Sequence, residues 1–92
     1  MTYGSTLIPV GAATTADVGP ASGGRLISVT VTAAAATTTV ALKQNGSGGS
    51  TIFSGSVIAN TSQQFRFGGA VYQGQLSVTT AGAAGVAYIE LG

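Results

Sequence analysis

Two carboxylates, Asp17 and Glu90, are the first residues to consider for chemistry, because the 92-residue chain contains no histidine and no cysteine. A glycosidase-type site needs two carboxyl groups about 5 to 10 Å apart, with the pKa of one raised so that it can act as an acid. The sequence predicts Asp17 in a loop and Glu90 on the outward face of the last strand, so we do not expect the two to meet. Lys43 with a serine would make a nucleophilic pair, but its surroundings indicate a solvated lysine on a strand. We therefore predict that the chain is not an enzyme and has neither a cofactor nor a metal site.

Two further patterns have a structural and a functional interpretation. The glycine-rich segment GSGGS, residues 46–50, lacks the following lysine and threonine and the helix of a phosphate-binding loop, so we expect a turn. Thr30, Thr32 and residues 37–39 would form an ice-binding array only with a repeat of fixed period, which the sequence does not have. Threonine is also a common strand residue, and we expect only that role here.

Charged residues are scarce, at 5% of the chain, against about 25% in an average soluble domain. The basic residues Arg25, Lys43 and Arg66 are far apart in the sequence, and the formal net charge is only +1. Nucleic acids bind through clustered Lys and Arg, so we expect no nucleic-acid partner. The best apolar run, AGAAGVAYI, is far shorter than the roughly 20 residues of a membrane span. The start MTYGSTLIPVG lacks the features of a secretory signal, so we expect neither a membrane span nor Sec export.

Alternation of apolar and polar residues predicts strands from Arg25 onward. In RLISVTVT, residues 25–32, the side chains of Ile27, Val29 and Val31 share the predicted inner face. Five later segments show a strand pattern: 37–44, 51–59, 60–69, 75–80 and 85–92.

Glycine and alanine mark the predicted connections and irregularities. The Asn-Gly pair that opens segment 45–50 favours positive φ, so this segment is predicted to be a hairpin turn. The alanine-rich segment 32–39 is interpreted as a second hairpin loop. Gly55 predicts a bulge or bend within its strand, and the Phe-containing strand is expected to end at Gly68 and Gly69.

The same alternation predicts which side chains enter the core. Phe65 and Phe67 share the inner face of their strand, and Arg66 lies on the outer face. Burying the unpaired carboxylate of Glu90 would be costly, so Tyr88 and Glu90 are predicted to face outward. The opposite face of the last strand then points into the core: Ala87, Ile89 and Leu91.

Six or more short strands without a capped helical segment predict an all-β fold. The expected architecture is a small antiparallel β-sandwich of six to eight strands, of the jelly-roll or immunoglobulin type. Residues 25–92 are expected to form this domain.

Residues 1–24 are predicted to form an N-terminal extended arm or edge strand. Pro9 cannot donate a ladder hydrogen bond from a central strand, and Leu7, Ile8 and Val10 need an apolar surface. We expect a strand of about three to five residues that adds to its own sandwich or reaches over a neighbouring subunit.

Three segments carry a resemblance to a known group: RLISVTVTA, TTTVALKQNGSGGSTIFS and QFRFGGAVYQGQLSVTTAGAAGVAYIEL. Over residues 25–91 the chain resembles small virion proteins of tailed bacteriophages. The matching positions are Leu26, Ser28, Val29, Val31, Thr32, Val40, Leu42, Phe67, Gly68, Gly69, Gly74, Leu76, Val78 and Tyr88. The sequence departs from the pattern at Lys43, where similar sequences often carry an aromatic residue, and at 73–75, which interrupts an apolar run.

The resemblance implies a non-enzymatic β-sandwich on the virion, with capsid decoration (cement) as the leading role. The implied partners are the phage major capsid protein and copies of the chain itself, as a homotrimer at local threefold positions of the shell. We expect the interfaces to include five apolar or aromatic residues: Leu7, Ile8, Val10, Tyr72 and Tyr88.

Two alternatives remain open at the level of sequence. A carbohydrate- or receptor-binding module of a tail would need Tyr3, Tyr72 and Tyr88 to converge on one groove. A minor tail or head-completion component would have the same sequence features as a decoration protein, and copy number per particle would separate the two.

Overall fold

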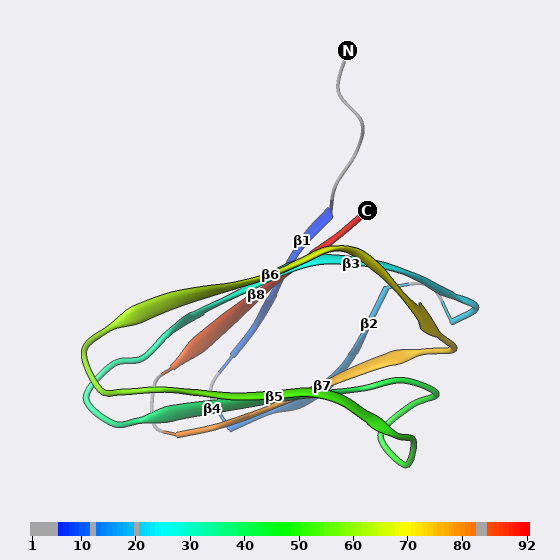
Figure 1. The fold of residues 1–92 in the computed structure, drawn as a ribbon. Coiled ribbons are helices and arrows are strands. Elements are labelled where there is room, and N and C mark those ends of the chain that lie inside the picture. Colours follow the sequence, from blue (N-terminus) through cyan, green and yellow to red (C-terminus); the bar gives the residue numbers. More distant parts are fainter. Residues whose placement is uncertain (1–5, 12, 20, 83–84) are drawn as a thin grey trace.

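The computed structural model describes residues 6–11, 13–19, 21–82 and 85–92, and this part of the chain forms two four-stranded sheets (Figure 1). Sheet A has the strand order β1 (Thr6–Val10), β8 (Val86–Leu91), β3 (Gly23–Thr32) and β6 (Ser62–Gln73). Sheet B has the strand order β2 (Thr15–Val18), β7 (Leu76–Ala81), β4 (Thr38–Lys43) and β5 (Thr51–Val57). All neighbouring strands are antiparallel.

The connectivity is that of a jelly roll. Consecutive strands change sheet at every connection except β4 to β5, and eight strands in two such sheets make a pair of Greek keys. The prediction of an antiparallel β-sandwich with six to eight strands is confirmed, and the jelly roll is the correct one of the two types expected.

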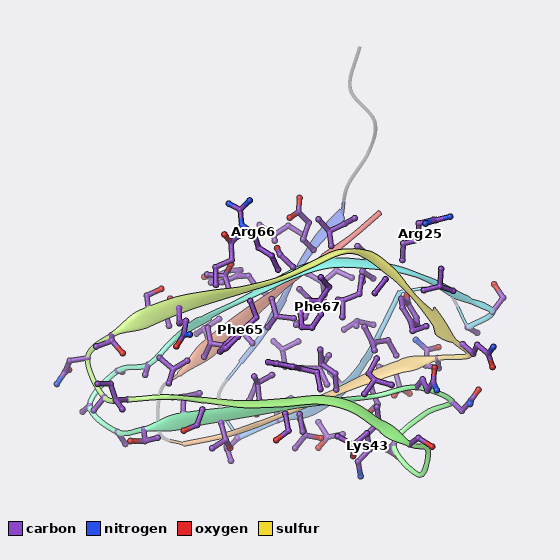
Figure 2. The ribbon with its side chains drawn as sticks, in the orientation of Figure 1. Arg25, Lys43, Phe65, Arg66 and Phe67 are labelled. Carbon is purple, nitrogen blue, oxygen red and sulfur yellow. The ribbon has the colours of Figure 1, made fainter. Side chains whose placement is uncertain are left out.

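The core lies between the two sheets, as Figure 2 shows. Its buried side chains are mainly aliphatic: Val10, Val18, Leu26, Val29, Val31, Ala33, Val40, Leu42, Val57, Leu76, Val78, Ala87, Ile89 and Leu91, with Tyr72. The predicted orientation of β8 is confirmed, because Ala87 and Ile89 are fully buried and Tyr88 is exposed. In β3 the buried residue is Leu26 and not Ile27 as predicted, because the register shifts between Leu26 and Ser28.

Three phenylalanines pack against the aliphatic core between β5 and β6. The ring of Phe53 lies 5.0 Å from that of Phe65 and 5.0 Å from that of Phe67, measured between centroids. Phe65 and Phe67 point between the sheets and Arg66 points outward, as predicted (Figure 2). Gly55 does not interrupt β5, since it pairs with Val40 within a continuous strand.

The role of Gly55 is to leave room for the aromatic rings. A Cβ at this position would lie 2.9 Å from Phe53 and 3.3 Å from Phe65. The hairpin of β4 and β5 is irregular at a different point, where the register shifts between Leu42 and Lys43. A packing requirement therefore explains Gly55, and the predicted bulge there is wrong.

Strand β6 does not end at Gly68 and Gly69 as predicted, because it continues to Gln73. Leu26 pairs with Ala70 and Ser28 pairs with Arg66, so the three residues 67–69 lie opposite the single residue Ile27. Gly68 and Gly69 have φ values of 64° and 85°, which glycine adopts without steric cost. The two glycines thus lie in a bulge of three residues against one, in the middle of an edge strand.

The N-terminal segment supplies one of the two edge strands of each sheet. β1 pairs with β8, and β2 pairs with β7. Asp17 was predicted to lie in a loop, but it lies on strand β2. A short loop after β1 brings residues 15–18 across to the other sheet. The loop is anchored by the buried hydroxyl of Thr80, which donates to the carbonyl of Gly11 at 2.6 Å and accepts from the amide of Thr14 at 3.1 Å.

The two predicted hairpin connections differ in outcome. Segment 45–50 joins β4 to β5, and Asn45 and Gly46 have the expected positive φ of 61° and 85°. Segment 32–39 is not a hairpin loop, because it joins β3 of sheet A to β4 of sheet B. Local sequence indicated a connection there, but the choice between the same sheet and the opposite sheet depends on distant strands.

Candidate interaction surface

The outer surface of sheet A carries charged, polar and aromatic residues that could contact a ligand or partner. Cross-strand pairing places Glu90 of β8 and Arg66 of β6 on either side of Ser28 in the central strand β3. We call these three residues the Ser28 row. The next row along the strands has the same order of strands and contains Tyr88, Thr30 and Gln64. These two rows together with Leu7 of β1 are the sheet A face.

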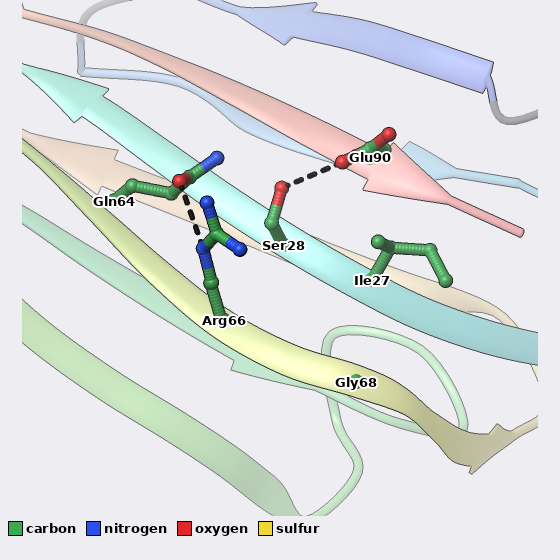
Figure 3. A pocket seen from close by; sticks show the side chains of 6 residues that line it. All are labelled: Ile27, Ser28, Gln64, Arg66, Gly68 and Glu90. Carbon is green, nitrogen blue, oxygen red and sulfur yellow. Dashed lines mark hydrogen bonds between the residues drawn. The ribbon is translucent and has the colours of Figure 1, made fainter.

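Hydrogen bonds fix the polar groups of the sheet A face (Figure 3). The Ser28 hydroxyl donates to Oε1 of Glu90 at 2.9 Å, and Nε of Arg66 donates to Oε1 of Gln64 at 3.2 Å. Ser28 lies between the two charged side chains and is only 4% exposed. Glu90 and Arg66 are two strand spacings apart, about 10 Å along the row. Each therefore forms its hydrogen bond with a neutral neighbour and not with the opposite charge.

The sheet A face is hollowed. One hollow of about 230 Å³ lies among Ile27, Ser28, Arg66 and Glu90, and a wider one of about 520 Å³ extends toward Leu7 and Tyr88. Leu7 is 61% exposed and Tyr88 is 38% exposed. The surface therefore combines one acid, one base and two exposed apolar groups around a polar centre.

Sheet B carries a matching arrangement on its own outer surface. Asp17 of β2 and Lys43 of β4 pair on either side of Ser77 in β7, and we call these three residues the Ser77 row. Ser77 is 1% exposed, and Nζ of Lys43 donates to the carbonyl of Ser47 at 3.3 Å. Figure 2 shows Lys43 and Arg66 on opposite outer surfaces of the sandwich. Each sheet thus has one row in which a central serine separates an acid from a base.

The five residues expected at interfaces occupy different environments. Leu7 and Tyr88 are exposed on the sheet A face, and Ile8 is half-buried against the core. Val10 and Tyr72 are each 2% exposed within their own chain, so they do not belong to its surface. Val10 points inward because Leu7 and Pro9 occupy the outward positions of β1.

Tyr72 is buried because the bulge at Gly68 and Gly69 changes which residues of β6 point inward. Its neighbour Val71 is 67% exposed. The Tyr72 hydroxyl is buried next to Gly19 and Gly24, where a Cβ would lie 2.7 Å and 3.0 Å from the oxygen. No residue that the structure describes forms a hydrogen bond with this hydroxyl, and burial raises the pKa of the Tyr72 phenol.

The carboxylates and tyrosines considered for chemistry do not come together. Asp17 and Glu90 lie on the outer surfaces of opposite sheets, so the two-carboxylate arrangement does not form. Tyr72 is in the core, Tyr88 is on the sheet A face, and Tyr3 lies outside the described residues. Among the described residues, no three His, Cys, Asp or Glu side chains are grouped as metal ligands.

The threonines are also divided. Thr30 and Thr32 belong to sheet A, Thr38 is fully buried between the sheets, and Thr39 is on the outside of sheet B. They form no common array. In the described part of the chain, no helix is long and apolar enough to cross a membrane.

Sequence reasoning missed the two rows as units. Alternation correctly placed Ser28, Arg66 and Glu90 on outward faces, but their proximity follows from the pairing of β8, β3 and β6. The available signal was the small number of charges: four of the five charged side chains lie in the two rows, and Arg25 is the fifth.

Comparisons with known proteins bear on the fold. No protein-family model and no curated protein sequence matches the chain. In structure it is similar to a chain from Bacillus endospore appendages, a family of disulfide-linked pili. The TM-score is 0.62 with 16% sequence identity, and the match covers 96% of this chain and 80% of that chain. The two proteins share a fold, and the neighbour is a structural protein of a pilus.

Proposed function

We propose that this chain is a non-enzymatic structural subunit that assembles with copies of itself outside the cell or on the surface of a particle. The observation that carries the proposal is the nearly uncharged surface of the sandwich. Among the residues that the structure describes, five large apolar side chains are exposed: Leu7, Ile52, Ile58, Val71 and Tyr88. A free monomer with so few charges has little electrostatic repulsion to prevent association. A subunit whose surface is covered by neighbouring subunits does not need that repulsion.

The fold is compatible with this role. Its similarity to a pilus protein shows that a jelly roll of this kind occurs in a self-assembling structure. The 92 residues contain no cysteine, so these residues would have to associate without disulfide links.

The particular assembly that we favour is a phage capsid, with the chain as a decoration protein. This choice is supported by the resemblance of residues 25–91 to small virion proteins. The partners would be the major capsid protein and two further copies in a homotrimer at local threefold positions. A subunit of a pilus-like filament is the second candidate, favoured by the shared fold with the endospore appendage.

Self-assembly is tested by light scattering coupled to size-exclusion chromatography, followed by negative-stain electron microscopy. We expect oligomers whose mass grows with concentration. A chain that stays monomeric at its highest soluble concentration would contradict the proposal.

The two assemblies are separated by a second experiment. Co-sedimentation with phage capsids that lack a decoration protein supports the capsid role, and filaments of the purified chain support the pilus-like role. Hundreds of copies per virion on a gel favour decoration, and a few copies favour a minor tail or head-completion component.

A further inference from the structure

We propose that two copies of this chain dock their sheet A faces around a two-fold axis that lies above Ser28 and runs parallel to β3. Glu90 of each copy then pairs with Arg66 of the other copy. The inference rests on the proposed self-assembly and names one surface and one symmetry for it.

The order of charges in the Ser28 row is the first argument. Glu90 and Arg66 are the direct partners of Ser28, one strand away on each side. A second copy is generated by a half-turn about this axis and lies face to face with the first. The half-turn exchanges the two sides of the row, so the Glu90 side of one copy lies over the Arg66 side of the other. Each acid therefore faces a base, and Ser28 faces Ser28 of the second copy.

The same order excludes the other simple two-fold arrangement. An axis perpendicular to the strands would leave each residue on its own side of the row. Glu90 would then face Glu90 of the second copy and Arg66 would face Arg66, and like charges in contact are strongly unfavourable. The row thus distinguishes between two symmetries that are otherwise similar in shape.

The bonding state of the charged groups is the second argument. Oε1 of Glu90 accepts from Ser28, and Arg66 uses Nε toward Gln64. In the described structure these bonds involve one carboxylate oxygen and one guanidinium nitrogen. The second oxygen of Glu90 and the two terminal nitrogens of Arg66 can then bind an opposite charge on a second copy.

The second row of the sheet A face fits the same axis. Tyr88 and Gln64 lie on either side of Thr30, so Tyr88 of one copy would cover Gln64 of the other. The exposed part of the Tyr88 ring and the hollow of about 520 Å³ beside it would be closed by this contact. Leu7, on the outer strand β1, would remain at the rim.

The contact is small. Three overlapping strands at about 4.8 Å spacing and six residues at about 3.4 Å give roughly 300 Å² per copy, below the approximately 800 Å² per partner of a standard interface. We therefore expect weak, salt-sensitive pairing in solution, which becomes significant where other contacts already hold many copies together.

Charge reversal tests the proposal by sedimentation velocity at high protein concentration and low salt. Glu90→Arg alone and Arg66→Glu alone should each weaken pairing by about tenfold, because both symmetric contacts become repulsive. An equal mixture of the two single variants, and the double variant Glu90→Arg/Arg66→Glu, should associate as the unchanged protein does. Lys43→Glu is the matched control, since it makes the same charge change as Arg66→Glu on the opposite outer surface of the sandwich and should leave pairing unchanged.

Thermal melts of each variant show whether it is folded, and the mixing experiment compares only folded variants. Assembly that is insensitive to both reversals would overturn the two-fold contact and leave the proposed self-assembly intact. Rescue of Arg66→Glu by Asp17→Lys, instead of by Glu90→Arg, would also overturn it and indicate that the sheet A face stacks on sheet B. An unchanged protein that remains monomeric in all conditions would count against the proposed function as well.

Discussion

Removing one oxygen atom from the core, by Tyr72→Phe, should make the protein more stable. The side chain is 2% exposed, and no described residue forms a hydrogen bond with its hydroxyl. A buried polar group without a partner costs about 1 to 3 kcal/mol. Its removal leaves a void of about 15 Å³, worth roughly 0.4 kcal/mol at about 24 cal/mol per Å³. We expect a net gain of about 1 kcal/mol in the free energy of unfolding.

The measurement is urea denaturation of dilute protein at pH 8. With a slope of about 1 kcal/mol/M for a chain of this size, the midpoint should rise by about 1 M. Tyr88→Phe is the control, because that ring is partly exposed and its change should stay within about 0.5 kcal/mol. If Tyr72→Phe instead lowered the midpoint by 1 M, the hydroxyl would have a hydrogen-bond partner and the reasoning would be refuted.

The same substitution has a pH-dependent consequence. Burial raises the pKa of the Tyr72 phenol in the folded state, whereas the unfolded chain loses this proton near the ordinary value of about 10. Above that pH the unfolded state binds fewer protons than the folded state, so the free energy of unfolding falls as the pH rises. We expect the advantage of Tyr72→Phe to grow between pH 8 and pH 11, as measured by urea denaturation at both values. An equal advantage at both would mean that the phenol titrates alike in the two states.

Three further substitutions test the packing by thermal and urea unfolding. Phe67→Ala removes a partly buried ring from the aromatic cluster and should cost about 2 to 4 kcal/mol. Arg66→Ala, one residue away on the outer face, is its control and should cost less than about 0.5 kcal/mol. Equal losses for the two variants would contradict the assigned faces. Thr80→Val keeps the shape of the side chain but removes the hydroxyl that bonds the Gly11 carbonyl and the Thr14 amide. We expect a loss of about 1 to 2 kcal/mol in the free energy of unfolding. An unchanged melting temperature would show that these two hydrogen bonds are dispensable. Gly55→Val should collide with Phe53 and Phe65 and cost about 1 to 3 kcal/mol, whereas Ser56→Val on the outer face of the same strand should be nearly neutral; a neutral Gly55→Val would mean that the rings move aside.

Alternation along single strands predicted much of the fold, because each inward or outward choice depends on neighbouring residues. It placed Phe65 and Phe67 in the core and Tyr88 and Glu90 outside, and the Asn45–Gly46 turn followed from its own backbone preference. It did not cover Tyr72, because the strand was expected to end at Gly69. In the structure three residues of β6 lie opposite one of β3, and the alternation resumes with the opposite phase.

The candidate surface was less accessible to sequence reasoning than the fold. Ser28, Glu90 and Arg66 are separated by up to 62 positions in the chain and meet only through the register of three strands. No local pattern encodes that register. Leu7 and Tyr88, the two residues expected at interfaces that the structure exposes, were chosen for their apolar character, which is a property of single positions.

The bulge in β6 has a consequence for the behaviour of the protein at high concentration. β6 is the longest strand, lies at the edge of sheet A and has a single charged residue, Arg66. A straight strand of this kind would be a template for amyloid-like growth, in which chains add edge to edge without limit. Gly68 and Gly69 divide it into two short segments with a bend between them, so an incoming strand could match only one segment at a time. A chain with so few charges can therefore accumulate to many copies while the backbone itself limits runaway fibre formation.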